Sequence, residues 1–307
     1  MISKGGMTSR LRQAAVAAVV AGVLCACAAP AARCQQDQGQ NQASDQVLLP
    51  AESAAKAKAL IAKTIAALGG DAYLNLKDVT AVARVSGFGH SGDLNGFGKE
   101  IEYAIPPDKE RDENLPKRNI ITVFNGDKGW QMDRGGVSPA SMTEVATYTE
   151  NVKKDMDNFL RHRIHEQNMI FRYAGIDIVD YNEAEWVEFV DADNRSFKMA
   201  VATGTHLPVR WVVDTRDANT RSRSEETTFY SNYHPISGIQ TAYQITTERN
   251  GIKTQQVFFD KIDYNTGLSP DLFTKESLDE RWAKVAPKKK KGDKDDDSDS
   301  KSSKSKN

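Results

Sequence analysis

The sequence contains few residues whose types and spacing could support catalysis. It has no Gly-x-Ser-x-Gly nucleophile motif and no His-Glu-x-x-His zinc motif. Its five histidines and its scattered carboxylates follow no recognisable catalytic order. We therefore predict that the protein is not an enzyme, and an unfamiliar hydrolytic site is the alternative.

A glycine-rich segment, Gly87–Gly92, matches the dinucleotide-binding pattern G-x-G-x-x-G. In dinucleotide-binding proteins this segment is followed directly by a helix, because the helix N-terminus binds the pyrophosphate. Here the segment is followed by a loop-like stretch, Asp93–Gly98, and then by a strand-like stretch, Lys99–Ile105. We interpret the glycines as a hairpin loop at the rim of a sheet, and we predict no cofactor.

A pair of histidines, His162 and His165, lies three residues apart in a predicted helix. Helical histidine pairs can bind zinc when a third ligand is close. No third ligand is visible nearby in the chain, and the flanking Arg161 and Arg163 disfavour a bound cation. The sequence therefore favours a polar helix face over a metal site.

Cysteine chemistry is confined to the N-terminal region, where Cys25, Cys27 and Cys34 all lie. No disulfide framework or cysteine metal site is available in the rest of the chain. The segment Leu24–Cys27 resembles a bacterial lipobox, which implies that Cys27 is lipidated and becomes the first residue of the mature protein. Cleavage after an A-x-A-like site at Ala29–Ala31 is the alternative, and it would release a soluble secreted product.

Both ends of the chain are predicted to lie outside the fold. Positively charged residues precede an apolar run, Ala14–Leu24, which is shorter than the roughly 20 residues that span a membrane. Residues 1–26 are therefore predicted to be a signal peptide, with an uncleaved anchor helix as the alternative. Residues 27–49 are predicted to be a flexible tether and residues 287–307 a disordered charged tail. The protein is thus expected in the periplasm or anchored to a membrane of a bacterial cell envelope.

The remaining residues, 50–286, suffice for one β-rich domain. Helices are predicted over Ala51–Leu68 and over Ser141–Asn168, which opens with a Ser–Glu capping box. A short closing helix is predicted after Ser269, and the charged stretch Pro106–Pro116 is expected to be a loop. The net charge of −1 gives no reason to expect a nucleic-acid partner.

Strand signals dominate the rest of this domain, most clearly over Glu185–Tyr264. Within it, Arg195–Ala202 places apolar residues on one side and polar residues on the other. Such alternation is typical of a strand with one buried and one solvated face. Short turns separate the segments, which predicts an antiparallel meander. Earlier strands are expected at Val79–Ser86, Asn119–Phe124 and Gly129–Met132.

Three stretches resemble the LolA/LolB-type lipoprotein-carrier superfamily, in the broad form of outer membrane lipoprotein-sorting proteins. They are AKALIAKTIAALGGDAYLNLKDV, TFYSNYHPISGIQTAYQITTERNG and VFFDKIDYNTGLSPDLFTKE. The resemblance implies an α+β fold: a strongly curved antiparallel sheet, or incomplete barrel, with helices packed in its concave face. It also implies that acyl chains of a lipoprotein, or another lipid, occupy the space between sheet and helices.

The balance of helices and strands agrees with that implication. A sheet whose apolar face lacks a second sheet must be covered by helices, and here few helices are available for many strands. Loose coverage would leave an apolar cavity, and a carrier would need its lid to move. We expect the lid to be the helix Ser141–Asn168, approached through the flexible pair Gly135-Gly136.

The leading hypothesis is thus an exported envelope protein that binds or carries a lipid or an acylated protein. The alternative is a lipoprotein that acts as a non-transporting interaction or regulatory module of an envelope complex. For each residue of the expected cavity lining, plain core packing is the alternative role. The expected lining residues are Trp186, Phe197, Met199, Val201, Val209, Trp211 and Val213.

Overall fold

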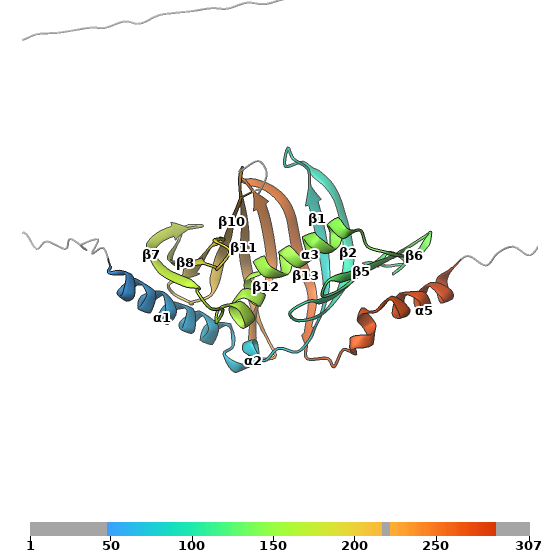
Figure 1. Ribbon diagram of the computed structural model, residues 1–307, viewed down its shortest axis with the longest axis horizontal. Coiled ribbons are helices and arrows are strands. Elements are labelled where there is room, and N and C mark those ends of the chain that lie inside the picture. The colour runs from blue at the N-terminus through green and yellow to red at the C-terminus, as the bar shows by residue number, and fades with distance from the viewer. Residues whose placement is uncertain (1–47, 217–221, 287–307) are drawn as a thin grey trace, which may run out of the picture. The chain divides into compact units, whose positions relative to one another are not determined.

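The computed structural model of the protein describes residues 48–216 and 222–286. The predicted signal peptide, the lipidation site Cys27, nearly all of the predicted tether and the tail 287–307 lie outside the described residues. All described strands belong to one antiparallel sheet of 13 strands. In Figure 1 the middle strands lie behind helix α3, and the strands at both ends of the sheet flank it. The predicted α+β fold with a strongly curved, unclosed sheet is therefore confirmed.

The first and last strands pair with each other in the middle of the sheet, so two meanders run outward from this pair. One is β1–β6 and the other is β13–β7, in the order β6-β5-β4-β3-β2-β1-β13-β12-β11-β10-β9-β8-β7. The strands are β1 (Val79–Phe88), β2 (Leu94–Ile105), β3 (Lys109–Leu115), β4 (Ile121–Asn125), β5 (Lys128–Asp133), β6 (Gly136–Pro139), β7 (Ile170–Val179), β8 (Asn182–Val190), β9 (Ser196–Ala202), β10 (Pro208–Arg216), β11 (Arg223–Ile236), β12 (Ile239–Arg249) and β13 (Ile252–Tyr264).

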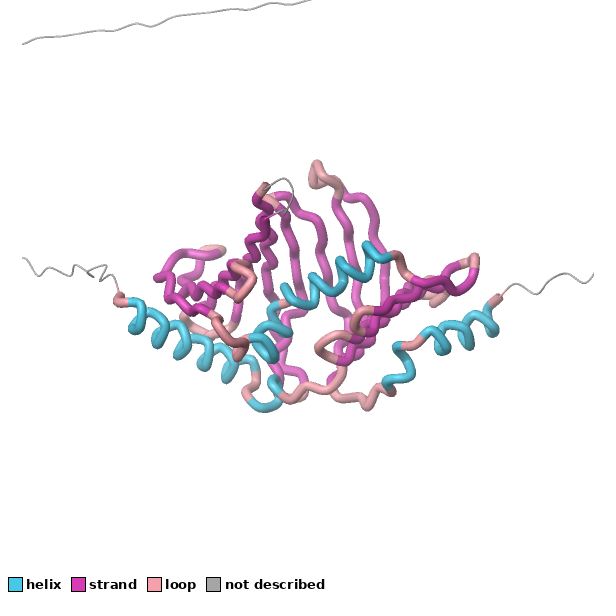
Figure 2. Tube along the Cα trace, in the orientation of Figure 1, coloured by secondary structure: helices cyan, strands magenta, loops and turns pink. Residues whose placement is uncertain are grey.

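Helices and helical turns accompany the sheet. Figure 2 shows them in cyan against the strands in magenta, with α3 crossing in front of the middle strands. They are α1 (Pro50–Leu68), α2 (Asp71–Leu74), α3 (Met142–Lys154), α4 (Met156–Asn158), the π-helical turn η1 (Phe159–Arg163), the 3-10 turn η2 (Pro270–Phe273) and α5 (Lys275–Val285).

The sheet carries helices on both faces at its β4 end. Alternate residues of β4 point to opposite sides, so Phe124 and Val123 contact different helices. Phe124 stacks on Tyr148 of α3, with ring centres 4.3 Å apart. Val123 packs with Phe273 of η2 and Leu278 of α5. Helix α3 therefore covers the concave face, as predicted for the lid, and α5 covers the opposite face.

Three local predictions are wrong. The stretch Pro106–Pro116, which was predicted to be a loop, contains β3. The stretch Asp93–Gly98, also predicted to be a loop, belongs to β2 from Leu94 onward. In β3, Arg111 and Glu113 face η2 and α5 and pair at 2.6 Å, so a strand made almost wholly of polar residues can still be buried on one face. The helix predicted up to Asn168 breaks at Asp155, whose backbone is extended, and only short turns follow.

Candidate functional site

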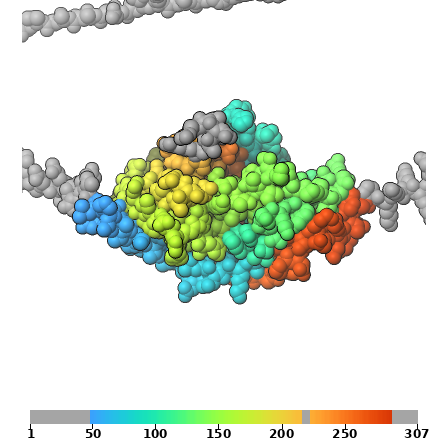
Figure 3. All heavy atoms as spheres, viewed as in Figure 1, coloured from blue at the N-terminus to red at the C-terminus, as the bar shows by residue number. Residues whose placement is uncertain are grey.

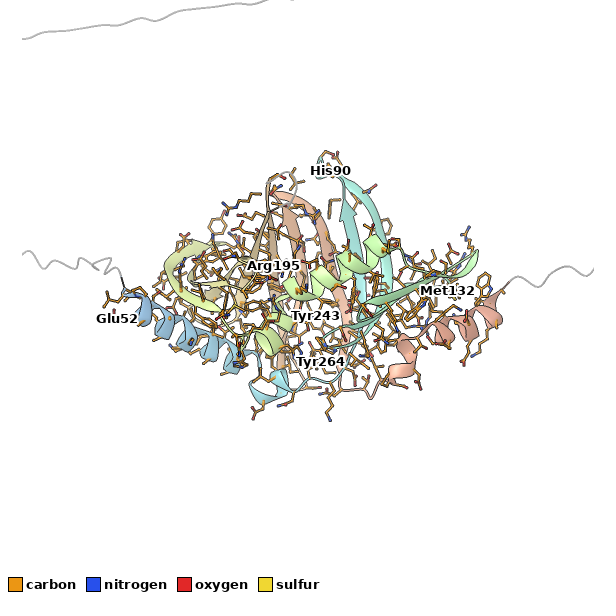
Figure 4. The ribbon with its side chains drawn as sticks, viewed as in Figure 1. Glu52, His90, Met132, Arg195, Tyr243 and Tyr264 are labelled. Carbon is orange, nitrogen blue, oxygen red and sulfur yellow. The ribbon has the colours of Figure 1, made fainter. Side chains whose placement is uncertain are left out.

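A cavity of about 630 Å³ lies on the concave face, between the middle strands and α3. Its walls come from β1–β3, from β10–β13, from the α3–α4 segment and from the chain around α2. Tyr264, labelled in Figure 4, lines it from the end of β13 and hydrogen-bonds Thr241 at 2.8 Å. In the space-filling view, side chains of α3, in green, cover much of the strands behind them (Figure 3). The cavity is therefore a space under a helix, as the sequence predicts for this fold.

Small and polar side chains contribute to the space of the cavity, beside larger ones such as Tyr230 and Phe259. Ala81, Ala104 and Ala242 line it from three different strands, and threonines such as Thr228 and Thr247 line it from β11 and β12. Short side chains at these positions take up little of the space between the sheet and α3. The sheet and the helix consequently leave a space that larger residues would fill.

Helix α3 is lightly attached over this space. Tyr148 is its one buried residue, and all of α3 is described. Its C-terminal end is fixed because the Trp211 Nε1 donates a hydrogen bond of 2.8 Å to the carbonyl oxygen of Lys154. At its N-terminus, Ser141 and Glu144 form the predicted capping box. A helix with so few buried contacts is a natural candidate for local opening.

The segment after α3 is held more firmly. The Tyr73 hydroxyl of α2 donates a 2.6 Å hydrogen bond to Asp157, and the Arg161 guanidinium lies 4.3 Å from the centre of the Tyr73 ring. Phe159 and Leu160 are fully buried beside them. The extended residue Asp155 therefore joins a loosely held helix to a fixed turn, which is the geometry of a hinge.

Carboxyl groups from the sheet and from this hinge meet at one side of the cavity. Desolvation, together with the nearby Asp112, raises the pKa of Glu102 to about 8. Desolvation and the proximity of Glu102 raise the pKa of Glu110 to about 7. The pKa of Asp155 rises to about 6 through desolvation and the charge of Asp157, although solvent in the cavity reaches this side chain. At neutral pH part of this group is thus protonated and uncharged.

Two of the expected lining residues, Trp211 and Val213, line the cavity. Phe197, Met199 and Val201 share their face of the sheet, which confirms the alternation predicted for β9. All three are fully buried in the core under α1 and η1, and they are not among the residues that line the described cavity. Side chains of α1 and η1 fill the space in front of these three residues.

The other two expected lining residues, Trp186 and Val209, lie on the opposite face. Both are half-buried around Ala184 and Ala200. Val209 is the extra residue of a β-bulge, since Pro208 pairs with Val201 and Arg210 with Ala200. A bulge shifts the alternation by one residue, so Val209 leaves the face that Trp211 and Val213 share. Trp186 precedes the inward Val187 and so points the other way.

Sequence reasoning missed the carboxyl side of the cavity. Glu110 and Asp112 lie in the stretch predicted to be a loop, and a loop has no alternating faces on which to group them. The available signal was the alternation of charges along Lys109–Leu115, in which Arg111 and Glu113 share one side and Glu110 and Asp112 the other. Asp155 was missed because the predicted helix ran through it without a break.

The remaining sequence motifs take no part in the cavity. The glycine-rich segment is the turn between β1 and β2, where the Gly89 amide donates to the Asp93 carbonyl, so the hairpin interpretation is confirmed. His162 and His165 do not line the cavity. Within residues 48–216 and 222–286, no cluster of three His, Cys, Asp or Glu side chains could hold a metal ion. No helix in the same ranges has the length and apolar character to cross a membrane.

Comparison with known proteins gives matches by structure. No family profile and no curated protein matches the sequence. A DUF1329 family protein from Desulfovibrio piger superimposes with a TM-score of 0.52 at 16% identity, covering 72% of this chain and 98% of that one. A domain described as an outer membrane lipoprotein-sorting protein, from Vibrio parahaemolyticus, gives 0.50 at 13% identity, with coverages of 74% and 99%.

The described chain has a LolA-like fold. This resemblance, predicted from three sequence stretches, is confirmed at the level of fold. A LolA superfamily protein from Nitrosomonas europaea also matches, with a TM-score of 0.47 at 11% identity over 72% of this chain and 99% of that one. At such identities the shared property is the LolA-like architecture of sheet and helices, and function must be argued from the cavity itself.

Proposed function

We propose that the protein binds a lipid, or the acyl chains of a lipidated protein, in the cavity under α3. The observation that carries this proposal is the cavity itself: about 630 Å³ on the concave face of a LolA-like sheet. Cavities of about 300–1,000 Å³ are typical of sites for small organic ligands. Each acyl CH₂ removed from water there contributes about 0.8 kcal/mol, so a chain can be held without a specific polar contact.

Ligand entry in this proposal depends on the hinge at Asp155. Helix α3 buries little of its own surface, and the turn after it is fixed by Tyr73 and Arg161. We infer that α3 swings about this joint while the α4–η1 segment stays in place. The predicted flexible pair Gly135-Gly136 lies at the turn into β6, a few residues before α3. Trp211 and Val213 are the residues of the expected lining that we propose contact the ligand.

A lipid-binding role also fits the predicted export of the chain. We propose that the protein works in the bacterial cell envelope, either free in the periplasm or attached through a lipid on Cys27. The mass of the mature N-terminus tests the attachment. A diacylated Cys27 supports it, and an unmodified N-terminus beyond Cys27 contradicts it.

One observation favours the alternative, a non-transporting interaction or regulatory module. The concave face of β8 and β9 is filled by aromatic residues, with the Phe159 ring centre 5.0 Å from that of Phe189 and 4.9 Å from that of Phe197. A protein that only displays its surfaces to a partner needs no open space, and this part of the face has none. The two functions differ in whether the remaining cavity takes up a ligand.

The test is uptake of a fluorescent fatty acid by the delipidated protein, with native mass spectrometry of protein purified from membranes. We expect saturable binding at one site and a co-purifying lipid. Ala104→Phe, which places a ring in the cavity, should abolish uptake. Ala174→Phe, the same change on the exposed edge strand β7, should leave it unchanged. Absence of uptake by the unaltered protein, or equal uptake by both variants, would overturn the proposal.

A further inference from the structure

A second, smaller pocket of about 350 Å³ adjoins the main cavity. The two pockets are neighbours, because they share part of their lining. The shared residues are Lys154, Val213, Glu226 and Arg249. The smaller pocket adds only hydroxyl side chains to these: Thr215, Ser222 and Ser224.

The pairing of β10, β11 and β12 explains why these residues gather. Glu226 pairs with Val213 on one side and with Arg249 on the other, so the three form one row across the sheet. Thr215 pairs with Ser224 in the row two residues further along. Residues two apart on a strand point to the same face, so the pocket continues the concave face beyond Trp211 and Thr228. The lining of the smaller pocket is mostly polar, whereas the lining of the main cavity is partly polar and partly apolar.

The charge of this pocket is positive. Arg249 donates to Glu226 at 3.1 Å, so these two charges largely cancel. The Lys154 ammonium has no ion-pair or hydrogen-bond partner among residues 48–216 and 222–286, and its side chain is only half-exposed. Its backbone is fixed, because its carbonyl accepts the 2.8 Å hydrogen bond from Trp211. An ammonium without an ion pair, carried on a fixed backbone position beside several hydroxyl groups, is suited to bind an anionic oxygen group.

The other side of the main cavity has the opposite character. Glu102 and Glu110 lie on β2 and β3 there, with Asp112 beside them, and Asp155 faces them from the hinge. An anionic group placed among these carboxyls would be repelled or would have to bind a proton. The same group at Lys154 would be attracted. The cavity therefore distinguishes its two sides by charge, and it imposes one orientation on an anionic amphiphile.

We propose that the smaller pocket is a subsite for the anionic head group, a carboxylate or a phosphate, of an amphiphile whose tail lies in the main cavity. This proposal rests on the proposed function and names its ligand class. Lys154 is the residue that selects the head group, with the hydroxyl groups of Thr215 and Ser224 as further donors. An uncharged lipid fits the main cavity equally well but gains nothing from this pocket.

The test compares a fluorescent fatty acid with its methyl ester, which has the same tail and no charge, at neutral pH. Lys154→Met removes the charge and keeps most of the stem. We expect it to weaken binding of the acid by about tenfold or more, as loss of a charge-assisted contact does, and to change binding of the ester less than about twofold. Lys154→Arg should restore binding of the acid.

The matched control is Lys153→Met. Lys153 is adjacent in the chain, pairs with Glu150 at 3.2 Å and lines neither pocket. It should leave the affinity for both probes unchanged. The unfolding midpoint of each variant is measured as a further control. Midpoints equal to that of the unaltered protein within error would show that the variants are folded.

The outcomes separate this inference from the proposed function. If neither probe binds the unaltered protein, the proposed function fails and the subsite fails with it. If the acid and the ester bind equally, or Lys154→Met weakens both alike, the subsite is refuted while lipid binding stands. Inorganic phosphate at millimolar concentration should not displace the ester. Inorganic phosphate and a long-chain alkyl phosphate are also compared as competitors of the fatty acid. If both displace the acid equally effectively, the pocket binds free anions and the amphiphile assignment is wrong.

Discussion

The concave face of this sheet has two regions that differ in how the space in front of them is used. In front of β8 and β9 it is filled: Phe159 of η1 packs against Phe189 and Phe197, and Trp211 of β10 borders both regions, with ring centres 4.9–5.2 Å from that of Phe159. In front of β11–β13 and β1–β3 it is hollow, and alanines and threonines are among the residues that line this space. Both regions belong to one sheet and share its alternation.

The difference shows that fold and binding capacity are set by separate properties of the residues. Alternation decides which side chains face inward, and it is equally clear in both regions. Side-chain size decides whether that face becomes a core or a cavity. The turn that follows α3 carries large apolar residues into the first region, whereas α3 itself offers the second region only one buried side chain. The proposed binding site therefore depends on a lightly attached helix over this part of the sheet.

The largest expected effect is loss of stability from Phe159→Ala, which would make the filled region hollow. Phe159 is fully buried. Removing its ring should lower the free energy of unfolding by about 3–5 kcal/mol, through lost burial and a new void. Urea unfolding followed by tryptophan fluorescence measures this. A loss below about 1 kcal/mol would mean that the two regions are packed alike.

The second effect concerns the carboxyls of the hollow region and pH. The pKa of Glu102 is raised in the folded state to about 8 from an ordinary value of 4.5, so the folded protein binds this proton more tightly than the unfolded chain does. Stability should therefore fall as pH rises from about 4.5 to 8. Glu102→Gln removes this penalty and should stabilise the protein by on the order of 1–2 kcal/mol at pH 8.5, with little effect at pH 4.5.

Unfolding curves at several pH values check this prediction. Glu276→Gln, on the exposed side of α5, is the control and should leave the pH dependence as it is. A Glu102→Gln variant that is less stable than the unaltered protein at pH 8.5 would show that this carboxylate is stabilised by a partner instead.

The third effect is on the attachment of α3. Ser141→Ala removes the hydroxyl that accepts a hydrogen bond from the Glu144 amide at 3.2 Å. The expected cost is about 1 kcal/mol, typical of a lost N-cap. The capped end of α3 lies beside β5, where the Gln131 amide donates to Glu144, so amide hydrogen exchange should rise in α3 and not in β8 or β9. Equal increases in both regions would indicate that the sheet and the helix open together.

The smallest effect is expected from Thr228→Val. Thr228 faces the cavity, so its hydroxyl meets open space and the change alters little packing. The free energy of unfolding should stay within about 0.5 kcal/mol. A fatty-acid tail should bind slightly more tightly because the wall becomes more apolar. A loss of more than about 1 kcal/mol would show that Thr228 is packed as tightly as the core residues.

The sequence was sufficient to predict much of this arrangement. The alternation of Phe197, Met199 and Val201, the capping box at Ser141 and the run of hairpins follow local rules that the structure obeys. The bulge at Val209 could not be foreseen, because a one-residue shift leaves no composition signal. Nor could the position of the cavity, since it depends on where the chain after Lys154 breaks and which strands it then covers.

The most direct test of the central claim is a photoactivatable fatty acid, cross-linked to the delipidated protein and located by peptide mapping. The account predicts cross-links in α3 and in the strands that line the hollow region, for example at Tyr230 and Ile245. It predicts none at Phe189, Phe197 or Met199, which lie in the filled region. Cross-links concentrated on those three residues, or spread evenly over both regions, would contradict it.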